Sequence, residues 1–116
     1  MKKVVTFGEV MVRLAPRENL RFEQVSPGTI DLTFGGAESS VAASVSMLGG
    51  ESRFVTALPR HAVTDAFLRQ MRGFEVDVDH VLLTKEGRFG LYYVETGANQ
   101  RPSRVIYDRQ YSAVSL

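Results

Sequence analysis

The chain has 116 residues, 44% of them hydrophobic and 23% charged, which is enough for one domain with a core and too few for a two-domain enzyme. Fourteen Lys and Arg against thirteen Asp and Glu leave a net charge of +1, which excludes the strongly basic surface of a dedicated nucleic-acid-binding protein. Cysteine is absent, so disulfides, thiolate metal sites and a Cys nucleophile are excluded. We expect the two histidines, His61 and His80, in loops or on the surface.

The N-terminal residues 1–9 do not have the pattern of a signal peptide. Two lysines precede a short apolar run that Gly8 and Glu9 interrupt. Nowhere do eighteen apolar residues follow one another, as a membrane-spanning helix requires. We therefore expect a cytoplasmic protein whose partners include neither a membrane nor a nucleic acid.

The first third of the chain is predicted to consist of short strands. Residues that are β-branched or alternate between apolar and polar indicate strands at 3–7, 10–14, 20–25 and 29–34. The Ser26-Pro27-Gly28 segment between the last two is typical of a turn. We interpret residues 10–34 as a small antiparallel flap.

The apolar period then changes to that of a helix over residues 37–48. Val41, Val45 and Leu48 recur at helical spacing, and Gly49 follows as the expected C-terminal cap. Most other positions of this helix are Ala or Ser, which lets neighbouring backbone approach closely. The pattern predicts a helix that packs on a sheet.

The remainder alternates between strands and one more helix. We expect a helix that Thr64 caps and Gly73 ends, a polar loop at 96–103, and strands at 53–58, 80–83, 89–95 and 104–108. Strands that alternate with crossover helices favour parallel pairing in a layered α/β sheet. This sheet has few strands and no helix for its second face, so we expect it to be part of a larger one.

Gly35-Gly36 stands directly before the first long helix. Glycines allow a ligand to approach the backbone, and a helix N-terminus offers unpaired N–H groups to an anionic or oxygen-rich ligand. A tight strand-to-helix turn explains the same pair without a ligand. Neither a Gly-x-Gly-x-x-Gly fingerprint nor a P-loop is present, which excludes nucleotide sites of those two kinds.

Tyr107-Asp108-Arg109 ends a predicted strand with a phenol, a carboxylate and a guanidinium. Alternation places Tyr107 and Arg109 on one face, where the guanidinium fork is suited to bind a small carboxylate. An ion pair between Asp108 and a neighbouring Arg is the alternative. Of the adjacent Tyr92 and Tyr93, one must face the core and the other must face away.

Gly87-Arg88-Phe89-Gly90 matches the backbone-clamping loop of KH domains. That loop joins two helices, whereas this one introduces the predicted strand at 89–95. The match therefore predicts no nucleic-acid site.

These motifs together resemble the sugar kinases of the ribokinase or phosphofructokinase-B family, and within it the kinases of sugar acids. The resemblance covers the whole chain, and Arg101 to Arg109 followed by Ser112-Ala113 is its most specific part. The other matching segments are Val5-Thr6-Phe7-Gly8-Glu9, Phe34-Gly35-Gly36-Ala37-Glu38, Val41-Ala42-Ala43-Ser44, Phe54-Val55-Thr56-Ala57-Leu58-Pro59 and Gly90-Leu91-Tyr92-Tyr93.

The resemblance implies a ribokinase-like fold, in which helices cover both faces of a layered α/β sheet and a small β lid closes over the sugar. The lid strands would lie within about residues 10–34 and 89–108 and would form the contact of a homodimer. Residues 1–116 would be the N-terminal part of this domain.

The resemblance also implies where the substrate binds. Gly35 and Gly36 would lie against the sugar hydroxyls, and Tyr92 would reach the substrate from a strand. Tyr107 and Arg109 would hold the acid end of a keto acid, in agreement with the guanidinium chemistry described above.

Two further positions depart from the pattern of the family. Ser40 stands where the family places Asn, so its contact with the substrate would be lost or bridged by water. Arg13 stands where relatives specific for neutral sugars carry an acid, so it is a further candidate contact for an acidic substrate.

The implied reaction transfers the γ-phosphoryl group of ATP, with magnesium, to the terminal hydroxyl of 2-keto-3-deoxygluconate. The Gly-Ala-Gly-Asp segment that supplies the catalytic base of the family has no counterpart here. We therefore expect no catalytic, nucleotide-binding or metal-binding residue in this chain and no activity of the chain alone. Two alternatives remain: a non-catalytic module that binds a sugar acid or dimerises through its lid, and a kinase of a neutral sugar such as fructose.

Overall fold

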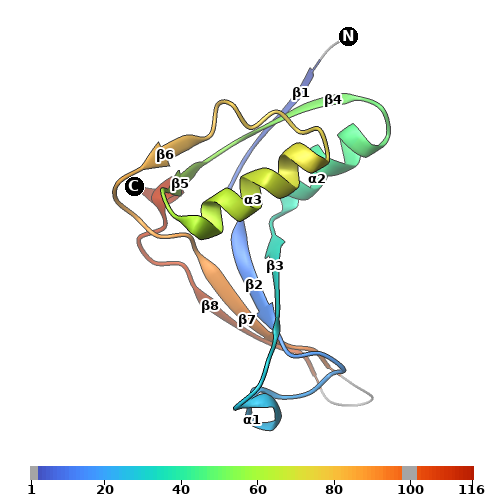
Figure 1. The fold of residues 1–116 in the computed structure, drawn as a ribbon, viewed down its shortest axis with the longest axis vertical. Coiled ribbons are helices and arrows are strands. Elements are labelled where there is room, and N and C mark those ends of the chain that lie inside the picture. The colour runs from blue at the N-terminus through green and yellow to red at the C-terminus, as the bar shows by residue number, and fades with distance from the viewer. Residues whose placement is uncertain (1–2, 98–101) are drawn as a thin grey trace.

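The computed structural model describes residues 3–97 and 102–116, which form two long helices and three small sheets (Figure 1). The elements in chain order are β1 (Lys3–Phe7), β2 (Met11–Ala15), α1 (Phe22–Val25), β3 (Asp31–Gly35), α2 (Ala37–Met47), β4 (Glu51–Val55), β5 (Ala57–Pro59), α3 (Ala62–Gly73), β6 (Leu82–Thr84), β7 (Leu91–Glu95), β8 (Arg104–Asp108) and the 3₁₀-helix η1 (Ala113–Ser115). The predicted mixed α/β class is confirmed. No helix of the described residues is long and apolar enough to cross a membrane.

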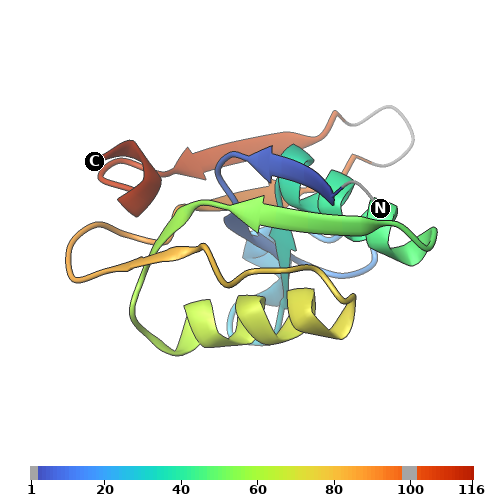
Figure 2. The ribbon, with the colours of Figure 1, turned by 90° about the horizontal axis from the view of Figure 1, so that it is seen from above.

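Two parallel strand pairs form the body of the molecule. β1 pairs with β4, and the two run side by side in Figure 2. Val5 is opposite Arg53 in this pair, and β5 pairs with β6. Helix α2 packs against β1 and β4, and α3 connects β5 to β6. The predicted parallel pairing through crossover helices is therefore confirmed.

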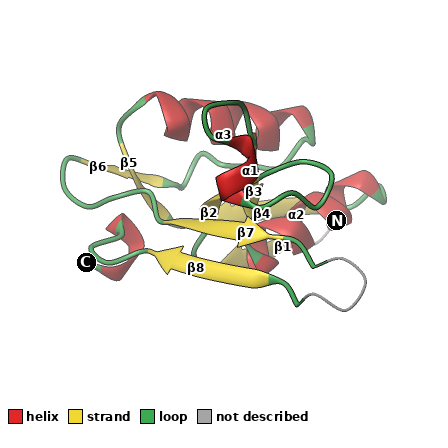
Figure 3. Ribbon diagram, turned by 90° about the horizontal axis from the view of Figure 1, so that it is seen from below, coloured by secondary structure: helices red, strands yellow, loops and turns green. Residues whose placement is uncertain are grey.

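The other four strands form a sheet that extends away from the two long helices (Figure 1). Its order is β3-β2-β7-β8, and β7 and β8 run side by side in Figure 3. The β2–β3 and β7–β8 pairs are antiparallel, but β2 and β7 are parallel. The antiparallel pairing predicted within residues 10–34 is confirmed by β2 and β3, and β2 has a second, parallel neighbour in β7, far along the chain.

Aromatic side chains join the body to this sheet. The ring centroid of Phe67 on α3 lies 5.2 Å from that of Phe34 on β3, 5.9 Å from that of Phe54 on β4 and 6.2 Å from that of Phe89. Phe54 and Phe67 are fully buried. The core therefore lies between α3, β3 and β4, where the body of the molecule meets the four-stranded sheet.

Helix α2 forms where the helical period predicts it, and Gly49 takes the left-handed φ of +91° that a C-terminal cap favours. Its buried residues, however, are the small Ser39 and Ala42, whereas Val41 is 49% and Leu48 88% exposed. The helix therefore packs on the sheet through its small residues, as predicted. Val41 and Leu48, which set the apolar spacing, point away from the sheet.

The strand predicted at 20–25 is wrong. The structure has the helical turn α1 there, in which the Arg21 N–H donates to Gln24 Oε1 at 2.8 Å and the Phe22 N–H donates to Glu95 Oε2 at 2.9 Å. The Phe22 ring also packs edge-on against Tyr93. Contacts with the distant β7 therefore override the local alternation.

The strand predicted at 53–58 is two strands, β4 and β5, separated at Thr56. The chain changes its partner here, because β4 pairs with β1 and β5 pairs with β6. Farther along, residues 78–81 form a turn, so the strand predicted at 80–83 lies at 82–84 instead.

Helix α3 begins earlier than predicted. His61, not Thr64, is its N-cap, and the His61 Nδ1 accepts a hydrogen bond from the Val63 N–H at 3.2 Å. Thr64 lies buried inside the first turn, where its hydroxyl donates to the Pro59 carbonyl. The strand predicted at 89–95 begins at Leu91, and Phe89, which precedes it, belongs to the core. Part of the predicted loop at 96–103 lies outside the described residues.

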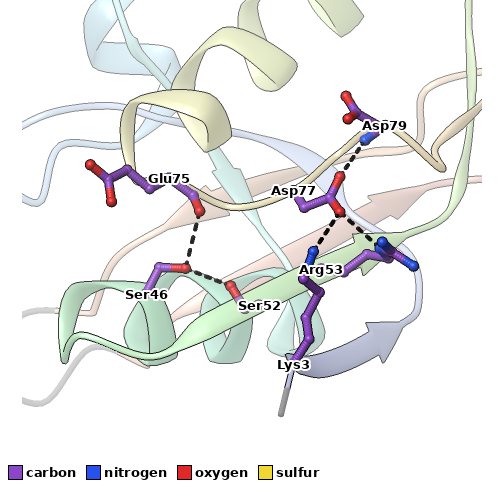
Figure 4. A network of polar contacts seen from close by, with 7 residues as sticks. All are labelled: Lys3, Ser46, Ser52, Arg53, Glu75, Asp77 and Asp79. Atoms are coloured by element: carbon purple, nitrogen blue, oxygen red, sulfur yellow. Dashed lines mark hydrogen bonds and ion pairs between the residues drawn. The ribbon is translucent and has the colours of Figure 1, made fainter. Parts of the chain in front are cut away.

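Asp77 ties the N-terminal strand to the segment after α3 (Figure 4). Its carboxylate accepts hydrogen bonds from the Asp79 N–H and Arg53 Nε at 2.9 Å and from Lys3 Nζ at 3.1 Å. These bonds, first the one from the Asp79 backbone and then those from the two cations, hold the pKa of Asp77 well below its usual range. In the same region the Ser46 and Ser52 hydroxyls lie 2.6 Å apart.

We expect Asp77→Asn to lower the free energy of unfolding by about 1–3 kcal/mol at pH 7, because the amide loses the charge that Lys3 and Arg53 face. A carboxylate whose pKa falls on folding stabilises the folded state above its unfolded pKa of about 3.9. The stability difference between the two proteins should therefore stay constant above about pH 5 and shrink as the pH falls below about 4. Urea unfolding measured across this range checks both, with Asp79→Asn as the control. A difference that does not change with pH would contradict this account.

Candidate functional site

The candidate site begins where β1 ends. β1 lies in a parallel pair, and ligands of α/β sheets bind beyond the carboxyl ends of such strands. Gly8 and Glu9 follow β1 directly, and the end of the Glu38 side chain from the first turn of α2 lies against Gly8, so a side chain at Gly8 would have to displace it. The Thr6 hydroxyl donates to the Glu38 carbonyl at 3.0 Å, which holds α2 at this edge.

The predicted glycine pair lies beside this edge. Gly35 is the last residue of β3 and Gly36 is the N-cap of α2. A side chain on Gly35 would collide with the Tyr92 hydroxyl, and a Cβ on Gly36 would lie 2.8 Å from the Glu9 carbonyl oxygen. Packing within the chain therefore requires both glycines. Their contact with a substrate stays a prediction.

Three of the predicted substrate-binding residues form one stack. The Tyr92 and Tyr107 rings, opposite each other on β7 and β8, have centroids 5.8 Å apart. The guanidinium carbon of Arg109 lies 5.4 Å from the Tyr107 centroid, within the range of a cation–π contact. Because Tyr92 also covers Gly35, the structure brings Gly35, Tyr92, Tyr107 and Arg109 together, and alternation alone predicts that Tyr107 and Arg109 share a face.

Asp108 does not pair with its neighbour Arg109. Its two carboxylate oxygens accept hydrogen bonds from Nη1 and Nη2 of Arg88, both at 2.9 Å, and this pair lowers the pKa of Asp108. The ion pair considered for Asp108 therefore exists, but with Arg88. Arg109 instead lies near Glu9, with Nη1 3.9 Å from Oε1, and its side chain is 56% exposed.

Arg13 and Ser40 lie in different surroundings. Arg13 on β2 is opposite Tyr92, so the two residues share a face of the four-stranded sheet. Ser40 is an exposed residue of α2 that lines a shallow depression facing α3, together with Phe34, Gln70 and Phe74. Arg13 therefore lies on the same face of the four-stranded sheet as Tyr92 and Tyr107, whereas Ser40 lies in the depression between α2 and α3.

Tyr93 points away from this site and packs against Phe22. Tyr92 and Tyr93 therefore face opposite ways, as alternation predicts. Both are half-buried, so neither is a fully buried core residue.

Sequence reasoning assigned no role to Glu9 or Glu38, the two acids at this edge. The available signal was their position, because Glu9 follows a strand that stops at glycine and Glu38 follows the glycine pair. No group of three or more His, Asp or Glu in residues 3–97 and 102–116 could hold a metal ion. Beside these two acids the site presents the Arg109 guanidinium and the Tyr92 and Tyr107 rings.

Comparison with known proteins identifies the family. A family model described as "pfkB family carbohydrate kinase" matches residues 1–115. The crystal structure of 2-dehydro-3-deoxygluconokinase from Thermotoga maritima is 44% identical, with a TM-score of 0.92 over 99% of this chain and 34% of that one. A PfkB family carbohydrate kinase from Listeria grayi is 33% identical, with a TM-score of 0.90 over 98% of this chain and 35% of that one.

Among curated proteins, 2-dehydro-3-deoxygalactonokinase from Haloferax volcanii is 36% identical over 97% of this chain and 35% of its own length. The chain thus spans about a third of the length of these relatives. Their folds also match the ribokinase-like architecture expected from the sequence. Since the family model covers almost every residue, the chain belongs to the pfkB family of carbohydrate kinases.

Proposed function

We propose that this chain is the substrate-recognising N-terminal part of a kinase that transfers the γ-phosphoryl group of ATP to the terminal hydroxyl of 2-keto-3-deoxygluconate. The relatives at 44% and 36% identity are named as kinases of 2-dehydro-3-deoxy sugar acids, which supports an acidic substrate. The proposal concerns the whole enzyme, of which this chain has the length of about a third.

The stack of Arg109 on Tyr107 is the observation that carries the proposal. Asp108 is engaged by Arg88, so the exposed guanidinium of Arg109 has N–H groups to offer an external anion. A guanidinium fork binds a carboxylate through two parallel charge-assisted hydrogen bonds. Tyr92 and Arg13 on the same sheet face supply further donors for the hydroxyls and the charge of a sugar acid.

The pfkB carbohydrate kinases use ATP, and we assign its site, that of magnesium and the catalytic base to the part of the enzyme beyond this chain. The sequence lacks both phosphate-binding glycine motifs, and the described residues offer no metal ligand set. Phosphoryl transfer depends on groups that surround the γ-phosphoryl, and we assign those groups to the rest of the enzyme. We therefore expect the chain alone to bind substrate without turnover.

The test is phosphorylation by the complete enzyme with magnesium and ATP, comparing 2-keto-3-deoxygluconate with fructose. We expect a kcat/KM at least about 100-fold higher for the acid, since a site built for a charged group rejects an analogue that lacks it. A preference for fructose would favour the neutral-sugar alternative. Binding of the acid without phosphorylation would favour the non-catalytic module.

We further propose that the four-stranded sheet forms the contact of a homodimer. Leu32, Leu14, Tyr93 and Ile106 lie in one row across β3-β2-β7-β8, on the face opposite Arg13 and Tyr92. Leu32 is 51% and Ile106 60% exposed, which is unfavourable for a surface that stays in water.

We expect Ile106→Asp to convert the dimer to a monomer, because a buried unpaired carboxylate opposes association. Sedimentation velocity of the complete enzyme measures this, with Leu48→Asp, an exposed position at the C-terminal cap of α2, as the control. A dimer that survives Ile106→Asp, or a wild-type monomer, would rule out this interface.

A further inference from the structure

Glu9 lies behind the guanidinium proposed to bind the substrate. Its Oε1 is 3.9 Å from Arg109 Nη1, and its side chain is only 23% exposed. Its other oxygen, Oε2, is buried and has no hydrogen-bond partner among the described residues. A buried carboxylate oxygen without a donor is costly, so a position that retains one calls for an explanation.

Gly90 makes room for this carboxylate beside Arg109. By register, Gly90 on the segment before β7 lies between Met11 and Arg109. A Cβ on Gly90 would lie 2.9 Å from Glu9 Oε2, 3.0 Å from Arg109 Cβ and 3.3 Å from Met11 Cγ. A side chain at this position would have to displace the Glu9 carboxylate from its place beside Arg109.

From these contacts we propose that Glu9 is a positioning residue for Arg109, an inference that rests on the proposed function. The Glu9 carboxylate lies 3.9 Å from one Nη of the guanidinium, and the Tyr107 ring lies against the face of the guanidinium. The remaining N–H groups then point to the open side, where the substrate carboxylate binds. A free Arg side chain loses much rotamer freedom on binding, so one that is already oriented binds more tightly.

Because Glu9 is charged, the direction in which its removal changes the KM for the acid tests the proposal. Glu9 also repels a substrate carboxylate, so removing its charge lowers the KM for the acid if repulsion dominates. If positioning dominates, the same change raises this KM. A role in folding alone changes the unfolding midpoint and leaves the KM unchanged.

The experiment is Glu9→Gln in the complete enzyme, with 2-keto-3-deoxygluconate as the varied substrate. We expect its KM to rise about fivefold to twentyfold, in the range of coupling between contacting residues, while kcat and the KM for ATP stay within twofold. Asp108→Asn is the matched control. It removes the carboxylate next to Arg109 in the sequence, which is bound to Arg88 and not to Arg109. It should leave the KM of the acid unchanged.

A double-mutant cycle separates positioning from a general disturbance of the site. In an Arg109→Ala background, Glu9→Gln should no longer raise the KM of the acid, since the group that it orients is gone. If Glu9→Gln lowers the unfolding midpoint, Glu9→Asp is measured instead. It keeps the charge, withdraws the carboxylate and should also raise the KM.

The proposal is overturned by an unchanged or lowered KM in these variants, or by an equal rise in the Arg109→Ala background. Failure of the wild-type enzyme to phosphorylate the acid would instead refute the proposed function. The two failures are therefore distinguishable.

Discussion

Arg109→Ala in the complete enzyme should raise the KM for 2-keto-3-deoxygluconate about 100-fold. The change removes two charge-assisted hydrogen bonds to the substrate carboxylate, each of about 1.5–3 kcal/mol, and tenfold in affinity corresponds to about 1.4 kcal/mol. Water solvates the substrate carboxylate in part when the guanidinium is missing. We therefore expect a loss near the lower end of the range that the two hydrogen-bond energies give. Steady-state kinetics with the acid as the varied substrate measures the effect.

Three comparisons make this result specific. Arg109→Lys should give an intermediate KM, because a point ammonium cannot reproduce the planar fork. Arg104→Ala should leave the KM unchanged, because it removes an exposed arginine of β8 that lies near Glu95 of β7. The KM for ATP should not respond to either Arg109 variant. An Arg109→Ala enzyme with the wild-type KM for the acid would remove Arg109 from the site.

Phe67→Ala should lower the free energy of unfolding by about 3–5 kcal/mol, the largest stability effect that we expect in this chain. The Phe67 ring contacts Phe34, Phe54 and Phe89, which come from three separate parts of the chain. Truncation therefore removes a buried ring and leaves a cavity that no single neighbour can fill. Urea unfolding followed by circular dichroism measures the loss.

Two other variants test whether the effect comes from this position in the core. Phe67→Leu, which retains most of the buried volume, should cost clearly less than Phe67→Ala. Phe74→Ala, at the C-terminal cap of the same helix, is the control, because Phe74 is 37% exposed. A loss below about 1 kcal/mol for Phe67→Ala would show that the interface between α3 and the sheets is not the core of this fold.

Elements stabilised by neighbours in the sequence could be predicted. Helix α2 is an example, since its Ala-rich and Ser-rich segment ends at Gly49, whose left-handed φ is a property of that position alone. The strand at 104–108 was also predicted at its observed bounds. In both cases the local pattern and the final contacts favour the same structure.

Elements whose partners lie far away could not be predicted. The alternating residues at 20–25 predict a strand, but Phe22–Val25 forms α1, whose Phe22 N–H bonds to Glu95, more than seventy residues later. The break at Thr56 arises because β4 and β5 belong to different sheets. Neither the pairing partner nor the sheet is visible in the local pattern.

The same division holds for the site. Alternation along one strand placed Tyr107 and Arg109 on a common face, which the cation–π contact confirms. The neighbours of these residues come from elsewhere: Arg88 binds Asp108, and Glu9 lies at the end of the first strand. The sequence thus predicted that Tyr107 and Arg109 share a face, but not that Arg88 pairs with Asp108 or that Glu9 lies near Arg109.

The most direct test of the account is whether a sugar acid touches the Arg109 guanidinium. The Arg Nε–H signals of the complete enzyme, assigned by comparison with Arg109→Lys, are followed by NMR during titration with 2-keto-3-deoxygluconate and, separately, with fructose. We predict that the Arg109 signal shifts and saturates with the acid and stays in place with fructose. An Arg109 signal that does not move while the acid binds would contradict the account.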